Sequence, residues 1–593
     1  MKLSDYVVDL IAELGVKHVF MLPGGGAMHL NDSLGRCSSL QCVCTLHEQG
    51  GAIAAEAYGQ YSGLGVLMVT TGPGGTNAIT GVAGAWLEST PMLVISGQVK
   101  RADLVGSRGV RQIGFQEIDI VSVARPITKF SVTVTDPGAI RRLLEEAVWK
   151  ATHGRKGPVW VDIPLDVQAS EIEPDSLERF VPPLEDPEQP ARVQAAAAKT
   201  LQLLSSAKRP VVLVGNGVRH AGAIDAFLKW VEALGVPVLT TWKALDFLPE
   251  NHPLYVGRPG AVGQRAANFA QQTADLLISL GARLDYGQTA YNHRNFAPRA
   301  SKVIVDIDPA ELAKLDMEID VPLVADAGAF LRALAEPSRN LDHPDWSAWR
   351  TRCAGLKTRF PVVQDSFHSV ISGVHNYVFV GALGRLLGHG DILIPGSSGA
   401  CSEVTSQALP VSKGIRFINT HGLGSMGFGV PAALGACLAS GGRRTVCIDG
   451  DGGFPMNAQE LAVIGRLKLP IKFFVLNNAG YGSIRATQIN YFERRFVACG
   501  PDSGLTFPEL RKSAESCGIP YCRIDSQANL SADVASVLGT PGAVVCDVQM
   551  APDQFTQPKV SSRQLADGSM VTMPMEDLWP FLEREEFDEI MAG

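Results

Sequence analysis

Short apolar runs alternate with helical stretches along the 593 residues of this chain. Runs such as 66–71, 210–214 and 472–476 are mostly aliphatic or aromatic and are followed at once by glycine or asparagine. Strands of this kind are buried on both faces, which is typical of parallel sheets whose strands are connected by helices. The pattern therefore predicts an α/β fold with three doubly wound parallel-sheet domains.

Two polar, proline-bearing stretches divide this pattern. Residues 170–192 and about 336–375 show little apolar periodicity and are predicted to be connections. The predicted domains are 1–170, 190–335 and 375–553. Residues 554–593 form a tail that is expected either to close over an active site or to lie on the surface as a strap.

Composition and charge exclude several classes of protein. A hydrophobic content of 46% with 19% charged residues is typical of a globular protein. The net charge of −8 argues against a nucleic-acid partner, which requires a basic face. No apolar stretch approaches the roughly 18 residues of a membrane-spanning helix, and the first residues lack a signal peptide. Eleven cysteines without a CxxC pair indicate reduced thiols. We therefore expect a cytoplasmic protein with no membrane partner.

Oxygen-bearing residues follow two neighbouring strands of the third predicted domain. Gly450-Asp451-Gly452-Gly453 ends one apolar run, and Asn477-Asn478 ends the next, with room between them for one crossover helix. Ligands of parallel sheets bind beyond the carboxyl ends of the strands. A carboxylate and an amide carbonyl meeting there suit Mg²⁺, which takes few protein ligands together with phosphate oxygens. The spacing predicts a cation-anchored diphosphate site.

An acidic residue stands at the start of a predicted helix in the first domain. Glu48 precedes a run of small residues over 50–57 that favours a helix closely approached by other backbone. The residue is either an acid favoured by the helix dipole or a carboxyl in an apolar pocket, which burial disposes to hold a proton. Glu56 is a competitor that we expect to be solvated or paired.

These motifs together resemble the thiamine diphosphate (ThDP)-dependent acetolactate synthase and pyruvate oxidase superfamily. His47-Glu48-Gln49, the segment 71–77, Gly450-Asp451-Gly452 and Asn477-Asn478 occur in that family's order, and the similarity covers almost the whole chain. The resemblance implies that Glu48 is the catalytic acid. It implies that Mg²⁺ is held by Asp451, Asn478 and the main-chain carbonyl of Gly480.

The resemblance also implies the remaining contacts of the cofactor. Gly424 would accept a hydrogen bond from the aminopyrimidine, and Met426 would hold ThDP in a bent shape, unless Met426 merely fills the core. The other cofactor-binding candidates are Pro23, Gly24, Gly72, Asn77, Gly399, Gly450, Gly452 and Gly453. The first domain would bind the pyrimidine and the third the diphosphate. Because family members form the site from two subunits, a homodimer or homotetramer is implied.

The middle domain resembles the FAD-binding domain of acetolactate synthases. The residues that carry this resemblance are Gly215, Gly217, Arg283, Asp306 and Asp326. A glycine-rich strand end followed by a helix start can bind a nucleotide diphosphate through backbone donors. The alternative is a vestigial domain that binds nothing. FAD is the expected second cofactor.

Several positions depart from the acetolactate synthase pattern. Ser483 and Thr487 replace the usual methionine and tryptophan, and Thr487 would leave space for a large acceptor. Ala400-Cys401 replace the usual Gln-His. Other segments resemble a narrower subgroup, the flavin-containing two-carbon transferases of yersiniose synthesis. The expected substrate-pocket residues are Gly25, Phe115, Ile484 and Thr487. Gln116 is a second catalytic candidate, with a solvent-facing glutamine as the alternative.

The sequence therefore predicts a ThDP-dependent carboligase. It would decarboxylate pyruvate, or a related 2-oxo acid, and transfer the acyl unit to a ketone or keto-sugar. The alternatives are acetolactate synthase itself, a flavin-dependent pyruvate oxidase or decarboxylase, and a non-catalytic protein that retains the scaffold.

Overall fold

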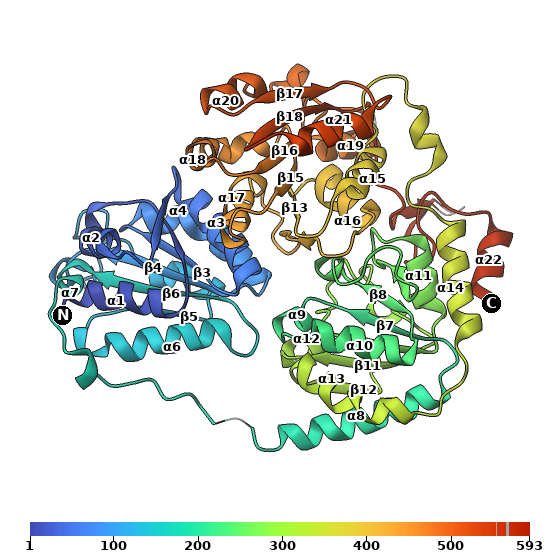
Figure 1. Ribbon diagram of the computed structural model, residues 1–593, viewed down its shortest axis with the longest axis horizontal. Helices are drawn as coiled ribbons and strands as arrows, with labels where there is room; N and C mark the ends of the chain where they lie inside the picture. The colour runs from blue at the N-terminus through green and yellow to red at the C-terminus, as the bar shows by residue number, and fades with distance from the viewer. Residues whose placement is uncertain (185, 553, 565–567, 593) are drawn as a thin grey trace.

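Three parallel sheets of six strands each make up most of the molecule (Figure 1). The structure is a computed structural model that describes residues 1–184, 186–552, 554–564 and 568–592. Helices lie on both faces of each sheet, and a two-stranded antiparallel hairpin lies in the tail. The fold class predicted from the sequence is confirmed. Among the described residues, no helix is both long and apolar enough to cross a membrane.

The first sheet has the strand order β2-β1-β3-β4-β6-β5. Its strands are β1 (His18–Met21), β2 (Gln41–Cys44), β3 (Gly65–Val69), β4 (Met92–Gln98), β5 (Phe130–Thr133) and β6 (Pro158–Pro164). Its helices are α1 (Leu3–Glu13), α2 (Met28–Arg36), α3 (Glu48–Ser62), α4 (Pro73–Leu87), α5 (Ile120–Ala124), α6 (Ile140–Thr152) and α7 (Leu165–Gln168). In α6 the buried residues Ile140, Leu143, Leu144 and Ala147 recur at helical spacing, so one face of this helix covers the sheet.

The middle sheet has the order β12-β11-β10-β7-β8-β9. Its strands are β7 (Pro210–Val214), β8 (Val238–Thr240), β9 (Tyr255–Gly257), β10 (Leu276–Leu280), β11 (Ser301–Asp306) and β12 (Val321–Val324). Its helices are α8 (Gln189–Ser206), α9 (Gly217–His220), α10 (Ile224–Leu234), α11 (Arg265–Thr273), α12 (Pro309–Ala313), α13 (Ala327–Ala335) and α14 (Ser347–Arg359). The order reverses between β7 and β10, as in dinucleotide-binding folds, and ligands of such sheets bind where the order reverses.

The third sheet, β14-β13-β15-β16-β18-β17, repeats the strand order of the first. Its strands are β13 (Ile392–Pro395), β14 (Arg416–Phe417), β15 (Thr445–Gly450), β16 (Ile471–Asn477), β17 (Tyr521–Ile524) and β18 (Val544–Gln549). Its helices are α15 (Asn376–Leu386), α16 (Val404–Ala408), α17 (Gly429–Ala439), α18 (Leu461–Leu467), α19 (Gly482–Tyr491), α20 (Leu510–Ser516) and α21 (Leu530–Gly539). The first and third domains therefore share a topology, although their sequences do not show it.

From Val560 on, the described part of the tail lies against the middle domain (Figure 1). It contains β19 (Ser562–Gln564), β20 (Met570–Thr572) and α22 (Arg584–Ala592). Asn268 of α11 donates from Nδ2 to the carbonyl of Met575 (2.5 Å), and Ile590 of α22 packs against Phe269 and Leu356. In the single chain this part of the tail is therefore a strap along the middle domain.

Two helices join the first and third domains through an unusually close contact. In α17, a Cβ atom on Gly435 would overlap the carbonyl oxygen of Ala54 in α3. Ala52, Ala54 and Ala55 are completely buried, as is nearly all of α17. Small residues on both helices let their backbones meet, so the contact fixes where α3 and its first residue lie.

We expect Gly435→Ala to weaken this contact because the added methyl group has no space. Overpacking of this kind destabilises by about 1–3 kcal/mol, which outweighs the gain in helix propensity. The thermal unfolding temperature should therefore fall. Gly35→Ala in α2 is the matched control, since its Cβ would meet no atom within 4 Å. An unfolding temperature equal to that of the wild type in both variants would contradict the contact.

Candidate active site

Glycine loops gather at the carboxyl ends of the strands of the first sheet. Gly24 follows β1, and its Cβ would lie 2.5 Å from Thr70, while a Cβ on Gly26 would overlap the hydroxyl of Thr71. Gly72, at φ +62°, approaches the carbonyl of Gln116 so closely that no side chain fits. Pro23 and Gly25 lie in the first loop. These loops leave backbone open at the edge where ligands of parallel sheets bind.

Glu48 is the first residue of α3 and is 5% exposed. Asn77 of α4 donates from Nδ2 to its Oε2 (3.0 Å). The other oxygen, Oε1, accepts no hydrogen bond from the residues that the structure describes. The side chain of His47 caps the helix by accepting from the amide of Gln49 (3.0 Å). Glu48 is therefore a buried carboxyl with one free oxygen, and it also lies at the helix start, where the dipole favours a charged acid.

The competing carboxyl, Glu56, is buried rather than solvated, which corrects one of our two expectations for it. It lies two turns along α3 and accepts from Nε2 of Gln60 (3.2 Å). Burial, together with the neighbouring carboxylate of Glu88, raises the pKa of Glu56 to about 8. Glu88 in turn pairs with Lys243 of the middle domain (2.6 Å), so this pair of carboxyls lies where the first and middle domains meet.

Glu460 of the third domain holds the loop that leads into Glu48, and sequence reasoning missed it. Its Oε1 accepts hydrogen bonds from the amides of Leu46 (3.1 Å) and His47 (3.1 Å). Gly50 faces this carboxylate, since its Cβ would lie 2.6 Å from Oε1. Burial raises the pKa of Glu460 to about 7, although the two amides oppose the shift. The position of Glu48 thus depends on a carboxyl more than 400 residues away.

Asp451 and Asn478 meet at the carboxyl ends of the adjacent strands β15 and β16, as their spacing predicts. The Oδ2 atom of Asp451 accepts from the amides of Asn478 (3.2 Å) and Gly480 (3.0 Å). Gly480 adopts φ +156°, where a side chain would overlap the carbonyl of Cys499. Burial raises the pKa of Asp451 to about 6, although these amides lower it.

This arrangement fits a divalent cation. The Oδ1 atom of Asn478 is buried and has no hydrogen-bond partner among the described residues. The Oδ1 atom of Asp451 likewise accepts no hydrogen bond there. Two free oxygens at one strand edge match the few protein ligands that Mg²⁺ takes. A cation would also favour the charged form of Asp451, against the effect of burial.

A second buried carboxyl, Asp449, lies beneath this edge and was not predicted. Glycines pack around it: the Cβ of Gly429 or Gly396 would overlap it, and the Cβ of Gly453 would lie 2.7 Å from its Oδ1. Burial raises the pKa of Asp449 to about 7. A cavity of about 490 Å³ opens beside Asp451 and Asn477. Of the three glycines in this loop, Gly453 faces the Asp449 carboxyl, whereas Gly452 lies against the ring of Tyr481.

The segment 424–428 projects from the third domain. Gly424 and Gly427 have φ values of +61° and +83°, and Asn457 donates from Nδ2 to the carbonyl of Gly427 (2.8 Å). Met426 is 38% exposed, so it does not fill the core. Asn457 was not predicted as part of this segment, because no local pattern links it to Gly427.

The predicted substrate residues are exposed in the single chain. Phe115 is 85% and Ile484 49% exposed, and α19 contains no buried residue. Gln116 has φ +64°, and Thr487 donates from Oγ1 to the carbonyl of Ser483 (3.1 Å). Large apolar side chains therefore stay uncovered beside the Gly72 loop and on α19, the helix that follows the Asp451 edge.

A cavity of about 370 Å³ lies where the three domains meet. Five predicted cofactor-binding residues line it, and they are Gly217, Arg283, Asp306, Asp326 and Gly424. Gly215 does not line the cavity. Instead, its Cβ would overlap Gly281, so it lets the ends of β7 and β10 approach. The volume lies within the range of small-molecule sites.

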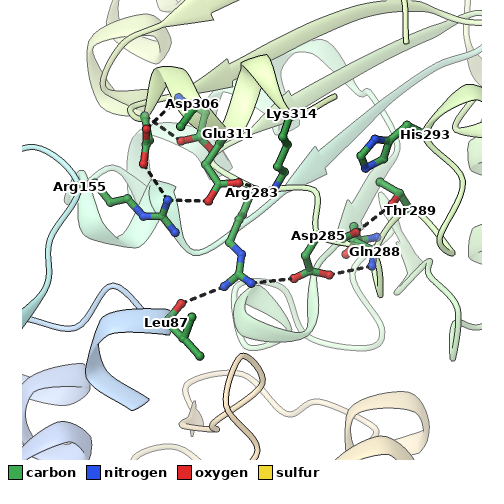
Figure 2. A network of polar contacts seen from close by, with 12 residues as sticks. Leu87, Arg155, Arg283, Asp285, Gln288, Thr289, His293, Asp306, Glu311 and Lys314 are labelled. Atoms are coloured by element: carbon green, nitrogen blue, oxygen red, sulfur yellow. Dashed lines mark hydrogen bonds and ion pairs between the residues drawn. The ribbon is translucent and has the colours of Figure 1, made fainter. Parts of the chain in front are cut away.

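Two arginines tie the first domain to the middle domain at this cavity (Figure 2). Arg283 donates from Nη1 to the carbonyl of Leu87 (2.9 Å). Arg155 of the first domain pairs with Asp308 (2.8 Å) and Glu311 (2.5 Å). Burial raises the pKa of Asp306. The side chain of Asp326 caps α13 by accepting a hydrogen bond from the amide of Ala329 (3.0 Å). Arg155 was not predicted, although the basic loop Gly154-Arg155-Lys156 before a strand could have suggested it.

The fold and the groups at the strand ends define a three-domain α/β protein with a candidate cation site at the Asp451 edge. The chain matches three family models in order. They are the thiamine pyrophosphate enzyme N-terminal TPP binding domain over residues 1–123, the central domain over 197–334 and the C-terminal TPP binding domain over 397–548. The chain therefore belongs to the thiamine pyrophosphate (ThDP) enzyme family.

Similar proteins narrow the class. The acetolactate synthase large subunit of Lactococcus lactis subsp. lactis is 32% identical over 589 residues, covering 99% of this chain and 98% of that protein. The chloroplastic acetolactate synthase of Arabidopsis thaliana is 33% identical over 575 residues, covering 94% and 83%. Acetolactate synthase 2 of Zea mays is 34% identical over 572 residues, covering 94% and 87%. The chain is thus a ThDP-dependent enzyme similar to acetolactate synthases.

We expect Asp451→Asn to weaken Mg²⁺-dependent binding of ThDP by at least roughly tenfold, because the charged oxygen ligand is lost. Titration calorimetry of the apoenzyme with ThDP, at several Mg²⁺ concentrations, measures this. Asp502→Asn is the control, since Asp502 is an exposed carboxylate nearby in the chain. An unchanged Mg²⁺ requirement in Asp451→Asn would place the cation elsewhere.

We expect Glu460 to make stability depend on pH. Folding raises its pKa from about 4.3 to about 7, so the folded state favours the protonated carboxyl. This contribution is complete below about pH 4.3 and is lost as the pH rises through about 7. The difference in unfolding free energy, wild type minus Glu460→Gln, should therefore fall by up to about 3 kcal/mol as the pH rises from 4 to 8. Parallel pH profiles of the two proteins in unfolding experiments would refute this.

Proposed function

We propose that this enzyme is a carboligase. It decarboxylates pyruvate, or a related 2-oxo acid, and transfers the acyl unit to a ketone or keto-sugar acceptor. The observation that carries the proposal is the Glu48 carboxyl, buried at the start of α3 with Asn77 on one oxygen and the other oxygen free. ThDP, when bound, supplies the carbon nucleophile and electron sink for such chemistry.

The role proposed for Glu48 follows from its surroundings. Asn77 fixes the orientation of the carboxyl through Oε2, while Glu460 holds the loop before it. The free Oε1 would share a proton with the aminopyrimidine of the cofactor. A carboxyl that cycles a proton contributes roughly 10²–10⁴-fold to a rate. Gln116, at the mouth of the Gly72 loop, is the second catalytic candidate.

The diphosphate end would be held by the third domain. Asp451, Asn478 and the carbonyl of Gly480 would bind Mg²⁺, supported by the two free oxygens of the side chains. Gly399, Gly450, Gly452 and Gly453 would let the diphosphate approach the backbone. Gly424 and Met426 would contact the pyrimidine end, which the exposure of Met426 supports.

FAD is the proposed occupant of the cavity among the three domains. The strand order of the middle sheet and the position of Gly217 at the start of α9 support this, because helix starts beside such strand ends bind diphosphates. Arg283, Asp306 and Asp326 line the same cavity. The flavin would have no redox role in carboligation.

The proposed assembly is a homodimer or homotetramer with the site completed between subunits. The exposed apolar side chains around Glu48 and on α19 support it, since such patches mark interaction surfaces. We also propose a cytoplasmic location, because all eleven cysteines are free.

The proposed acceptor is larger than pyruvate, as in the yersiniose-type transferases that the sequence resembles. Thr487 and Ser483 give α19 short polar side chains, and Ile484 is exposed beside them. Acetolactate synthase itself is the less favoured alternative, because these positions differ from its usual residues.

The test is to supply the holoenzyme with pyruvate, with and without ketones, and to analyse CO₂ release and products by mass spectrometry. We expect CO₂ and a ligation product. Glu48→Gln should lose about 10²–10⁴-fold in rate while retaining ThDP. Failure of the wild type to release CO₂, or full activity of Glu48→Gln, would defeat the proposal.

A flavin-dependent pyruvate oxidase is the second candidate, and the cavity among the three domains is the observation that favours it. The absorbance of the bound flavin distinguishes the oxidase from the carboligase. Bleaching of flavin absorbance by pyruvate at the rate of turnover would indicate oxidation, whereas an unchanged spectrum during CO₂ release would exclude it. The ligation product then distinguishes carboligation from simple decarboxylation.

A further inference from the structure

Three side-chain oxygens from three separate elements converge on the open face of Gly399. A Cβ on this glycine would lie 3.1 Å from Oε2 of Glu403, 3.2 Å from Oγ of Ser483 and 3.5 Å from Oγ1 of Thr556. Glu403 ends the π-helical turn Gly399–Glu403, Ser483 belongs to α19 and Thr556 lies in the tail. The absence of a side chain at residue 399 keeps the space between these oxygens open.

None of the three oxygens is used within the described part of the protein. Among the described residues, the Glu403 carboxylate has no hydrogen bond and no ion pair within 4 Å. The hydroxyls of Ser483 and Thr556 likewise have no hydrogen-bond partner there. A half-buried carboxylate without a partner is unfavourable unless a ligand or water supplies donors. The convergence therefore points to a ligand.

The fold holds these groups in place. Thr556 precedes Gln557, whose amide donates to the hydroxyl of the buried Tyr377 (2.9 Å). Gln407 then accepts from the Tyr377 hydroxyl (2.6 Å) and donates to the carbonyl of Pro558 (2.7 Å). The start of the tail is thus anchored in the core of the third domain, so Thr556 is positioned rather than loosely placed.

The group lies beside the candidate active site. Glu403 also lines the wall of the 370 Å³ cavity proposed for FAD, together with Ser402 and with Gly424, whose segment would hold the pyrimidine. Ser483 lies on the same helix as Ile484 and Thr487. The oxygens therefore lie between the segment that would hold the pyrimidine and the helix that would face the acceptor.

We propose that Glu403, Ser483 and Thr556 form a subsite that selects an uncharged ketone bearing hydroxyl groups as the acceptor. This deepens the proposed carboligase function and rests on it. An ionised carboxylate only accepts hydrogen bonds and can take two neighbouring hydroxyls, while the two side-chain hydroxyls both donate and accept. The same charge repels a second 2-oxo acid, whose carboxylate would be forced against it. The enzyme thereby disfavours condensation of pyruvate with itself.

The experiment compares three acceptors with pyruvate as donor: erythrulose, which carries three hydroxyls; 2-butanone, its unhydroxylated counterpart; and pyruvate itself. The wild type should prefer erythrulose in kcat/KM. In Glu403→Gln, which keeps the shape but not the charge, kcat/KM for erythrulose should fall about tenfold or more. Self-condensation of pyruvate should rise by a similar factor, and use of 2-butanone should not change.

Controls separate this subsite from the rest of the site. Glu515→Gln removes an exposed carboxylate of α20 and should leave all three values unchanged. Unfolding temperature and ThDP content show that Glu403→Gln is folded and loaded. Two outcomes would overturn the subsite but not the carboligase. In one, Glu403→Gln loses kcat/KM equally with all three acceptors; in the other, the ratios of kcat/KM among the acceptors do not change while CO₂ release is intact.

Binding of the acceptor can be measured without turnover. Saturation-transfer NMR of erythrulose with the ThDP- and Mg²⁺-loaded enzyme should show binding that Glu403→Gln weakens. If the wild type releases no CO₂ from pyruvate, the proposed function fails. The subsite is tested independently of that result. It is overturned if the wild type does not bind erythrulose, or if Glu403→Gln binds erythrulose as well as the wild type does.

Discussion

The position of the Glu48 carboxyl depends on one close approach, in which two helices from different domains touch through their backbones. Gly435 of α17 lies against the carbonyl of Ala54 in α3. Since Glu48 is the first residue of α3, this contact also sets where its carboxyl lies. Glu460 adds a second constraint from the third domain by binding the amides before Glu48. Glu48 is therefore positioned by two contacts with the third domain, one through α17 and one through Glu460, and not by a free loop.

Buried carboxyls recur around this joint, and each is held by neutral donors. Glu48 is held by an amide side chain, whereas Glu460 and Asp451 are held by backbone N–H groups. Burial raises the pKa of Glu460 to about 7 and of Asp451 to about 6, because no cationic side chain among the described residues offsets the loss of hydration. The site is thus assembled as a set of polar groups that a charged cofactor and a metal ion would complete.

Local pattern was enough to predict the sheets and the meeting of Asp451 with Asn478, because parallel strands bring their carboxyl ends to one edge. It also suggested four residues of the middle domain that line the cavity among the three domains, namely Gly217, Arg283, Asp306 and Asp326. It could not find Glu460 or Asn457, which act across contacts that leave no spacing signal in one sequence. Glu56 is paired with Gln60 but not solvated, because α3 is covered by α4 on one side and α17 on another, so a polar position faces no solvent.

The cavity among the three domains has a further consequence. Its walls include Arg155 from the first domain, Arg283 from the second and Gly424 from the third, so no fragment of the chain contains it. Any molecule that occupies it binds only the docked arrangement and, by mass action, stabilises that arrangement over states in which a domain has swung away. Binding in the cavity would then require all three domains to be docked. A substitution that loosens one domain contact far from the cavity would increase the dissociation rate of the bound molecule.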